Sequence, residues 1–530
     1  MEFDYVIVGG GSAGCVLANR LSADPSNRVC LLEAGGEDRN PWIHLPVGYV
    51  KTMVDPAVNW LFETSPEETS GGRAIPVPRG KVLGGSSAIN GMLYVRGQGR
   101  DYDTWAQMGC RGWSYDDILP YFKKSEGRAE GGDDYHGADG PLHVAMPTNT
   151  YEVLDKMIEA GGALGYPMNN DYNGSSQDGF SYYQLTQKNG RRFSAKSAYI
   201  NPIRKTRPNL TIETGAFAQR VIIKDGKATG VVIRQSGQER TITVEREVIL
   251  SAGAIQSPQL LELSGIGQGA RLQALGIDVV HDLPGVGENL QDHYISRLSY
   301  ELKDVDSLNE LTKGLRLVGE ALKYALFRKG ALTMPAGIVG GFVKSHPDLD
   351  EPDIQYHIAH ATFKNPHKRI FDDFPGITIG PCQLRPESRG SIHAKSPDMA
   401  DAPDIAPNFL SEKTDCDVHI AGQRMARDLV ATAGFAPHVV REISPGSDVA
   451  TDEGLLDHAR NTGATLYHPV STCKMGTDPN AVVDPELRVN GVTGLRVVDA
   501  SIMPRLISGN TNAPTMMIAE KAADMILADR

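Results

Sequence analysis

Residues 5–33 read YVIVGGGSAGCVLANRLSADPSNRVCLLE, and this stretch decides the fold. An apolar run of strand length is followed by a glycine turn with the spacing G-x-G-x-x-G, formed by Gly9, Gly11 and Gly14. Apolar residues at helical spacing come next, and a second apolar run ends at Glu33. This order is typical of a dinucleotide-binding unit, in which the glycines admit the pyrophosphate and the acid accepts from a ribose hydroxyl.

The same turn also matches a second motif. Gly10–Gly14 fits G-x-S-x-G, the nucleophile elbow of α/β hydrolases, which likewise joins a strand to a helix. That elbow normally follows several strands, whereas this turn follows the first strand of the chain, and a hydrolase gives Glu33 no role. The P-loop pattern G-x-x-x-x-G-K-[ST] does not occur. The dinucleotide interpretation is therefore favoured.

Composition excludes further classes of protein. The chain has 530 residues, enough for two or more domains, and 40% of them are hydrophobic, which allows a large core. Lys and Arg number 53 against 65 Asp and Glu, a net charge of −12 that opposes nucleic-acid binding. The 57 glycines follow no repeat and indicate many close backbone approaches, as around a cofactor.

Cysteine spacing and the N-terminus bear on the compartment. None of the six cysteines forms a C-x-x-C pair, which predicts reduced thiols rather than a disulfide scaffold. The acidic start lacks the basic residues of a signal peptide, and the uncharged stretch 5–19 is shorter than the ~20 residues of a membrane helix. We expect a cytoplasmic protein without a transmembrane segment, and a peripheral contact at the inner face of a membrane stays open.

Other segments suggest how the chain is organised. The second glycine block, 79–92, contains apolar residues among its glycines and serines, which indicates that it lines the binding site of a flat ligand. Residues 205–250 predict five short strands with hairpin turns at Gly226, Gly230 and Gly237, followed by an apolar helix after Gly253. From about 300 to 460 glycines become less frequent. The pattern there predicts strands (353–360, 390–395) and a helix (415–432), and this change in composition indicates a second domain. The strand 494–499 ends in an acid, so the nucleotide domain uses both chain ends.

Several blocks together resemble the glucose–methanol–choline (GMC) family of FAD oxidoreductases. They are Gly9 to Glu33, Gly80 to Arg96, GAIQSPQLLELSGIG at 253–267, LPGVGENLQDH at 283–293, Tyr467-His468-Pro469 and Asn510-Thr511-Asn512. Within the family the chain looks most like bacterial FAD-dependent alcohol dehydrogenases, including choline dehydrogenase-like and L-sorbose dehydrogenase-like members.

The resemblance implies an α/β fold (α+β overall) with two domains. A Rossmann-like FAD-binding domain is assembled from 1–155, 196–297 and 462–530, and a substrate domain with a largely antiparallel sheet flanked by helices comprises 156–195 and 298–461. The residues that the resemblance assigns to FAD are Gly9, Gly11, Ser12, Ala13, Gly14, Glu33, Ala34, Gly85, Asn90, Gly91, Met92, Leu93, Val221, Asp499, Ala500 and Asn512. From the residues alone, Asp499 fits a helix cap before Ser501 equally well.

The resemblance also implies the catalytic pair His468 and Asn510. Alcohol oxidation moves a hydride from the carbinol carbon to flavin N5, and a neutral imidazole is suited to take the hydroxyl proton near neutral pH. An amide can orient the hydroxyl and support the histidine without adding charge. We expect no metal, because H-E-x-x-H is missing and His357 and His360 would face opposite sides of a strand. His293, in a glycine-rich turn, is interpreted as structural.

Two departures from the family pattern refine the expectation. Some relatives bond FAD through a histidine before the asparagine of the second glycine block; this chain has Ile89 there, so we expect non-covalent FAD. Choline-type members place a glutamate two residues before a Gly-Gly-Phe segment; this chain has Ile338 there, which predicts a neutral primary alcohol as substrate.

Alternatives remain at this stage. An L-sorbose, polyol or choline dehydrogenase and an oxygen-using alcohol oxidase all fit the family motifs, although we favour an acceptor such as a quinone or cytochrome over oxygen. A nicotinamide-dependent dehydrogenase fits the first βαβ unit but does not need the block 80–90. A non-catalytic flavoprotein would not need His468 with Asn510.

Overall fold

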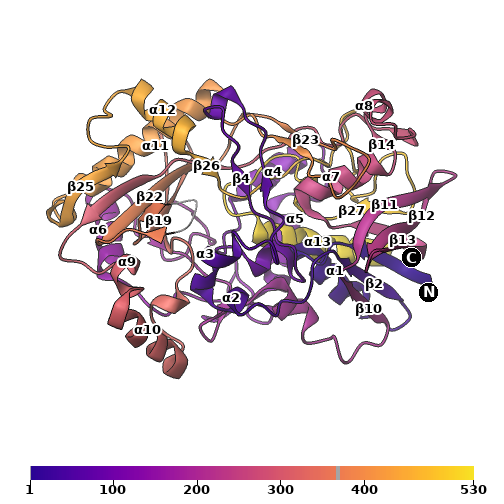
Figure 1. Ribbon diagram of the computed structural model, residues 1–530, viewed down its shortest axis with the longest axis horizontal. Helices are drawn as coiled ribbons and strands as arrows, with labels where there is room; N and C mark the ends of the chain where they lie inside the picture. Colours follow the sequence, from indigo (N-terminus) through magenta and orange to yellow (C-terminus); the bar gives the residue numbers. More distant parts are fainter. Residues whose placement is uncertain (1, 366–369, 530) are drawn as a thin grey trace.

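The computed structural model describes residues 2–365 and 370–529, and its strands form two large sheets (Figure 1). The first sheet has the order β10-β2-β1-β13-β12-β11, with β27 also paired to β13. Its strands are β1 (Glu2–Val8), β2 (Val29–Glu33), β10 (Leu210–Thr214), β11 (Phe217–Lys224), β12 (Lys227–Gln235), β13 (Gln238–Leu250) and β27 (Leu495–Val497). β1 pairs in parallel with β2 and β13, so the carboxyl ends of these strands meet at one edge, where ligands of such sheets bind.

Helices from both chain ends cover this sheet. α1 (Ser12–Leu21) packs against α13 (Asn512–Ala528), and the two lie side by side in Figure 1. Arg20 on α1 pairs with the buried Glu520 on α13 at 2.7 Å. α13 is buried over most of its circumference, so its apolar residues are not confined to one face. The remaining helices of the nucleotide side are α4 (Gly99–Gln107), α5 (Tyr115–Ser125), α7 (Gly253–Leu263) and α8 (Gly269–Ala274).

The second sheet is antiparallel along its main path, β25-β17-β22-β19-β18-β7. Its strands are β7 (Gly179–Tyr182), β16 (Tyr294–Ile295), β17 (Leu298–Leu302), β18 (Val339–Val343), β19 (Ile354–Ala359), β22 (Gly376–Gln383), β25 (Val439–Ser444) and β26 (Ala464–Thr465). β18 carries two glycines because the rings of Tyr183 and Phe180 lie where side chains at Gly340 and Gly341 would stand. α6 (Glu152–Ala163) and α11 (Lys413–Ala431) pack on this sheet.

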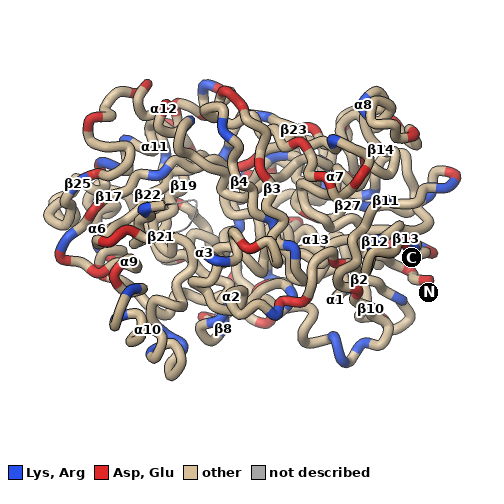
Figure 2. The backbone as a smooth tube through the Cα atoms, in the orientation of Figure 1, with Lys and Arg blue, Asp and Glu red and all other residues tan. Residues whose placement is uncertain are grey.

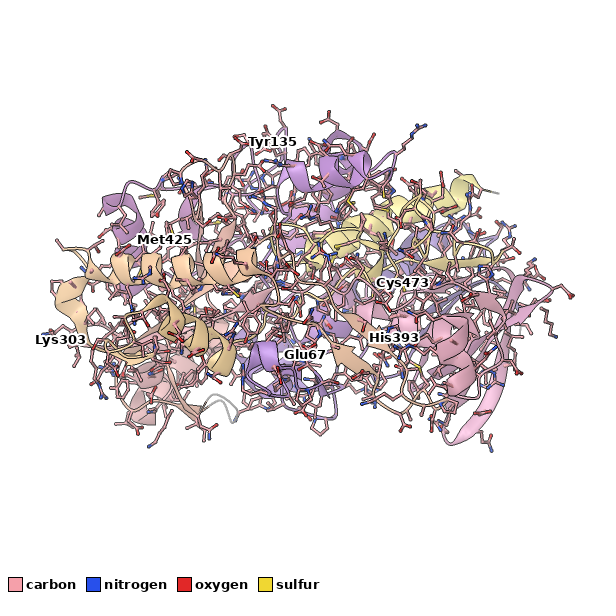
Figure 3. The ribbon with its side chains drawn as sticks, turned by 90° about the horizontal axis from the view of Figure 1, so that it is seen from above. Glu67, Tyr135, Lys303, His393, Met425 and Cys473 are labelled. Atoms are coloured by element: carbon pink, nitrogen blue, oxygen red, sulfur yellow. The ribbon has the colours of Figure 1, made fainter. Side chains whose placement is uncertain are left out.

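Shorter elements complete the chain. They are the helices α2 (Pro41–His44), α3 (Tyr49–Thr52), α9 (Leu308–Leu311), α10 (Gly314–Phe327) and α12 (Asp452–Thr462), and the two-stranded ribbons β3–β4 (Phe62–Glu63, Pro76–Val77), β5–β6 (Glu126–Arg128, Leu142–Val144), β8–β9 (Gln187–Lys188, Arg191–Arg192), β14–β15 (Ile266–Gly267, His281–Asp282), β20–β21 (Phe363–Asn365, Ile370–Phe371) and β23–β24 (Ser391–His393, Asp404–Ala406). In the view from above, Met425 on α11 lies in one half of the molecule and Cys473 in the other (Figure 3).

The predicted fold class is confirmed: a mainly parallel sheet stands beside a largely antiparallel one, with helices on both. Two local predictions were wrong. Gly230 lies inside β12 and makes no turn, whereas Gly226 and Gly237 do turn, with φ of 74° and 79°. The two strands predicted in 241–250 are one strand, β13, which is long because it pairs with β12 at its start and with β27 at its end.

The division into two domains stays a proposal, and sheet membership adjusts it. β16 and β26 belong to the second sheet, although the sequence ranges gave them to the nucleotide domain. β23 packs against α7, on the nucleotide side of the molecule. We therefore propose that β16 and β26 belong to the substrate domain, and that β23 and β24 belong to the nucleotide domain.

Candidate active site

A cavity of about 540 Å³ extends from the first sheet to the second. On the nucleotide side it is lined by the turn after β1, the end of β2 and the segment after β13. On the other side the lining residues include Ile295, Ser299, His357 and Thr378 from strands of the second sheet, and Arg297, which directly precedes β17. The cavity therefore has two parts. One lies at the edge of the first sheet, where sheets of this kind bind dinucleotides, and the other is walled by residues of the second sheet.

Glycines shape the end of the cavity at the first sheet. Gly9 has φ of 106°, in the left-handed region, and a side chain there would collide with the Ser251 backbone. Gly85 has φ of 54°, and its Cβ would lie 2.5 Å from the Cα of Gly11. The two glycine blocks thus meet at the N-terminus of α1, where backbone N–H groups and the helix dipole favour a phosphate.

Glu33 lies at the end of β2 and lines the same part of the cavity. Its carboxylate accepts from the backbone N–H groups of Gly10 (2.9 Å) and Gly35 (2.7 Å). Burial raises the pKa of Glu33 to about 7, although these two N–H groups oppose the rise. Each carboxylate oxygen retains a lone pair, so a ribose hydroxyl can still be bound.

The chain end contributes Asp499 and Asn512. Asp499 caps the short 3₁₀ helix Ala500–Ile502 through the Ser501 N–H, and it also accepts from the N–H of Gly253 at 2.8 Å. Asp499 therefore acts as a cap and lines the cavity, so the two readings of the sequence are compatible. Asn512 accepts from the Ser12 hydroxyl at 2.8 Å, which ties the start of α13 to the start of α1.

The cavity brings together all the predicted cofactor residues except Gly14 and Val221. Gly14 packs its Cα against the Gly9 carbonyl, where no side chain fits, and so it holds α1 onto the sheet. Val221 is buried in β11 and gives its N–H to the Ser264 hydroxyl. The residues of β11 that line the cavity are instead Phe217 and Ala218, near the start of the strand.

His468 and Asn510 lie together in the cavity wall. The Nδ2 atom of Asn510 is 3.1 Å from Nε2 of His468, and Oδ1 of Asn510 accepts from Gln355 on β19 at 3.2 Å. Asp292 accepts from the backbone N–H of His468 at 2.7 Å and thereby fixes the loop that carries the ring. Only 7% of His468 is exposed.

The proton positions on His468 follow from its neighbour His293. Nε2 of His293 is 2.9 Å from the Leu384 carbonyl, which can only accept, so this nitrogen carries hydrogen. A neutral His293 therefore accepts at Nδ1, and Nδ1 of His468, 2.9 Å away, must donate to it. Nε2 of neutral His468 is left without hydrogen and faces the Asn510 amide, as a general base requires.

Electrostatics keep both rings neutral. Burial lowers the pKa of His293 to about 4. The pKa of His468 lies well below 6.5, because burial, and then the neighbouring His293, His357 and Arg79, disfavour the imidazolium. The sequence interpretation of His293 as a structural residue was therefore incomplete, since its ring contacts the ring of His468 directly.

Sequence reasoning missed two further polar residues of the wall. His357 on β19 is half-buried and lines the cavity, and its buried Nε2 has no hydrogen-bond partner among the described residues. Burial lowers its pKa to about 3. Arg79 lines the cavity and donates to the Tyr467 carbonyl, one residue before His468. Because these residues are more than 100 positions from His468, only the fold could bring them there.

Two positions singled out by sequence comparison behave differently. Ile89 lines the cavity, so an aliphatic side chain does face the cofactor region. Ile338 does not: it packs in the hydrophobic core of the second sheet, while Ala336 and Gly337 line the cavity. The prediction that Ile338 contacts the substrate was therefore wrong, because its side chain points into the core.

A cluster of Asp133, His136 and Asp171 lies outside this cavity. Nδ1 of His136 is 3.0 Å from a carboxylate oxygen of Glu126, and Nε2 is 3.0 Å from one of Asp171. Hydrogen bonds to Asp171 and Glu126 raise the pKa of His136 against the effect of burial. A ring that donates from both nitrogens has no lone pair for a metal.

Comparisons with known proteins agree with this geometry. Two family models described as GMC oxidoreductase match residues 3–295 and 386–519. The chain is 44% identical to an alcohol dehydrogenase [acceptor] of Pseudomonas putida, over 99% of this chain and 96% of that protein. It is 42% identical to the mitochondrial choline dehydrogenase of Homo sapiens, over 99% and 90%.

A solved structure extends the match to three dimensions. It is a formate oxidase variant of Aspergillus oryzae, made to study modification of its FAD, with a TM-score of 0.92 and 27% identity over 100% of this chain and 98% of that one. The motifs, the two sheets and the family models therefore lead to one assignment. The chain belongs to the GMC oxidoreductase family.

Proposed function

We propose that this protein is an FAD-dependent enzyme that oxidises a neutral primary alcohol to the aldehyde. The observation that carries the proposal is the hydrogen-free Nε2 of His468 beside Asn510, in the wall of a cavity that continues to a glycine cradle. The alcohol dehydrogenase and choline dehydrogenase relatives support oxidation of a hydroxyl group.

FAD fits the residues of the cradle. Gly9, Gly11 and Gly85 leave room for a pyrophosphate at the start of α1, and Glu33 offers a carboxylate to a ribose. When bound, FAD supplies the acceptor for the hydride of the alcohol. We propose non-covalent binding, because Ile89 faces the cavity and cannot form a bond to the cofactor.

His468 handles the proton of the alcohol. The substrate hydroxyl takes the place of the Asn510 amide at Nε2, and that amide N–H then donates to the hydroxyl oxygen. His468 accepts the hydroxyl proton, while its Nδ1–H stays bonded to His293. The guanidinium of Arg79 disfavours the imidazolium but favours negative charge on the alcohol oxygen.

The wall of the cavity favours a neutral substrate. The carboxylates that line it, among the described residues, are Glu33, Asp372 and Asp499. Glu33 and Asp499 accept from backbone N–H groups at the nucleotide end, whereas Arg79 and Arg297 line the wall and would repel a cation. The choline dehydrogenase relatives make choline the second candidate.

The electron acceptor and compartment are further parts of the proposal. We favour a quinone or cytochrome over oxygen, as the name of the Pseudomonas putida relative suggests a separate acceptor. We also propose a cytoplasmic protein, since its six cysteines are free thiols and five are buried.

A substrate panel tests the proposal. Purified holoenzyme is assayed with neutral primary alcohols of increasing length, with choline and with a polyol, each with oxygen and with an artificial dye as acceptor. We expect the highest kcat/KM for a neutral alcohol with the dye. A kcat/KM for choline that equals or exceeds the value for neutral alcohols of similar size would overturn the substrate, and fast turnover with oxygen alone would overturn the acceptor.

A further inference from the structure

The helix α10 (Gly314–Phe327) is unusual because none of its residues, all of them described, is buried. Its most exposed apolar side chains are Leu315 (90%), Leu326 (71%) and Phe327 (67%). In Figure 1 the helix projects from the substrate half of the molecule, away from the sheets. A row of exposed apolar side chains is rare on a monomeric soluble protein and marks an interaction surface.

Four of the exposed apolar residues lie on one face of α10. Leu315, Val318, Leu322 and Leu326 are spaced by three, four and four residues, which places them in one stripe along the helix. α10 is amphipathic in the usual sense, but its apolar face points to solvent. The stripe therefore has no partner in this chain among the described residues.

The charge around α10 selects the kind of partner. Residues 313–329 contain the basic residues Lys313, Arg316, Lys323, Arg328 and Lys329 and one acid, Glu320, a net charge of five minus one, +4. The whole chain carries −12, so this segment opposes the overall sign. Lys and Arg mark both ends of α10 in Figure 2. An apolar stripe flanked by basic residues is typical of a helix that lies in the interface of an anionic membrane.

A second copy of the chain fits this surface less well. Packing two α10 helices against each other would bring two segments of charge +4 together, and like charges across an interface oppose association. Among the residues described, no helix is long and apolar enough to cross a membrane, and α10 itself has 14 residues. A helix of this kind binds a bilayer along its surface.

We propose that α10 docks the protein onto the surface of an anionic lipid bilayer. Leu315, Val318, Leu322 and Leu326 enter the region between headgroups and acyl chains. Lys323, Arg328 and Lys329 contact lipid phosphates, whereas Lys313 and Arg316 are paired with Asp373 and Asp306. This inference goes beyond the proposed function and does not depend on the identity of the alcohol.

Both ends of α10 adjoin segments that line the cavity. Lys313, directly before the helix, donates to the carbonyl of Asp372 at 2.5 Å, and Asp372 is a lining residue. After the helix, the 3₁₀ turn Ala331–Thr333 packs against Pro46–Gly48, and the next residue, Tyr49, also lines the cavity. Docking through α10 would thus bring the cavity wall close to lipid, where apolar alcohols and quinones concentrate.

Vesicle sedimentation of the holoprotein tests the proposal. One set of vesicles contains equal parts of phosphatidylcholine and phosphatidylglycerol, and the other contains phosphatidylcholine alone. The protein should sediment with the anionic set, more weakly with the neutral set, and less at high salt. Replacing Lys323 and Lys329 by Ser should weaken anionic binding roughly fivefold per residue.

Apolar variants complete the test. Leu322→Asp with Leu326→Asp should abolish sedimentation, whereas the matched control Met168→Asp, at an exposed Met (66%) outside α10, should bind as the wild type does. The flavin spectrum of each variant reports folding. The proposal is overturned if wild type ignores anionic vesicles, or if the α10 variants bind as wild type does. It is also overturned if light scattering shows a dimer that the α10 variants dissociate.

Discussion

The Nδ1 atoms of His293 and His468 lie 2.9 Å apart, at the centre of a chain of hydrogen bonds that starts at the Leu384 carbonyl. The carbonyl fixes the hydrogen on one histidine, which in turn fixes the hydrogen on the other. The backbone carbonyl of Leu384, directly after β22, thus determines which nitrogen of His468 is free to accept a proton.

His293 is therefore a positioning residue, and its replacement should alter chemistry more than binding. His293→Leu should lower kcat about tenfold to hundredfold, the range for removal of a partner that orients a functional histidine, with a smaller change in KM. His293→Asn can place an amide oxygen near the position of Nδ1 and should restore part of the loss. Equal losses in both variants, or a change confined to KM, would contradict the positioning role.

His468 itself should be far more sensitive. His468→Ala removes the base and should reduce kcat about 10²–10⁴-fold with the best alcohol, while the absorbance of bound flavin stays the same. Stopped-flow reduction of the flavin measures the loss directly. His419→Ala serves as a matched control, because this histidine is also buried but does not line the cavity. Near-normal flavin reduction in His468→Ala would refute the assignment.

If His468 is the base, as we propose, its pKa sets the acid limit of activity. The base must be unprotonated, and a pKa held well below 6.5 keeps it so at lower pH than a solvent-exposed histidine. A plot of kcat/KM against pH should therefore stay level on descending through 6.5 and fall only at more acidic pH. Introducing Arg79→Met should move this fall upward, since a nearby positive charge is removed. A midpoint at or above 6.5 in the wild type would count against the neutral, buried base.

The glycine cradle offers a test of cofactor binding. Gly85→Ala places a methyl group 2.5 Å from the Cα of Gly11 at a φ of 54°, so the two glycine blocks must separate. The purified variant should contain much less FAD per polypeptide. Gly36→Ala is a suitable control, because its Cβ would meet no atom within 4 Å. Full FAD occupancy of Gly85→Ala would show that the blocks do not form the cradle.

The attachment of the flavin can be checked by denaturation. Ile89 lines the cavity at the position where some relatives carry the bonded histidine, and its side chain cannot be alkylated. Acid precipitation should therefore release all flavin into the supernatant. Yellow colour or flavin mass retained on the denatured polypeptide would disprove non-covalent binding.

Local sequence predicted the nucleotide end of the site well. The turn Gly9–Gly14 and the acid Glu33 form one continuous βαβ unit, so their positions follow from spacing alone. The second glycine block does lie close to the first, at Gly85 and Gly11, and its contact with FAD stays a prediction. The fold class and the family were confirmed.

The substrate end was harder to predict. The resemblance assigned Val221 to the cofactor, whereas Phe217 and Ala218 are the residues of β11 that line the cavity, and which height of a strand reaches a cavity depends on the fold. Ile338 was misplaced because the backbone before β18 turns Ala336 and Gly337 toward the cavity. His293 and His357 were undervalued because their significance depends on a ring contact and on a buried nitrogen that only tertiary packing creates.

The bond between Ser12 and Asn512 joins residues 500 positions apart, and Asn510 lies just before the last helix, α13. A ribosome must therefore have made nearly the whole polypeptide before the pyrophosphate cradle and the proton acceptor can exist together. Nascent chains can build β1, β2 and α1 early, but they cannot retain the cofactor until α13 has left the exit tunnel. Stable binding of the cofactor therefore requires that synthesis of the chain is complete through α13.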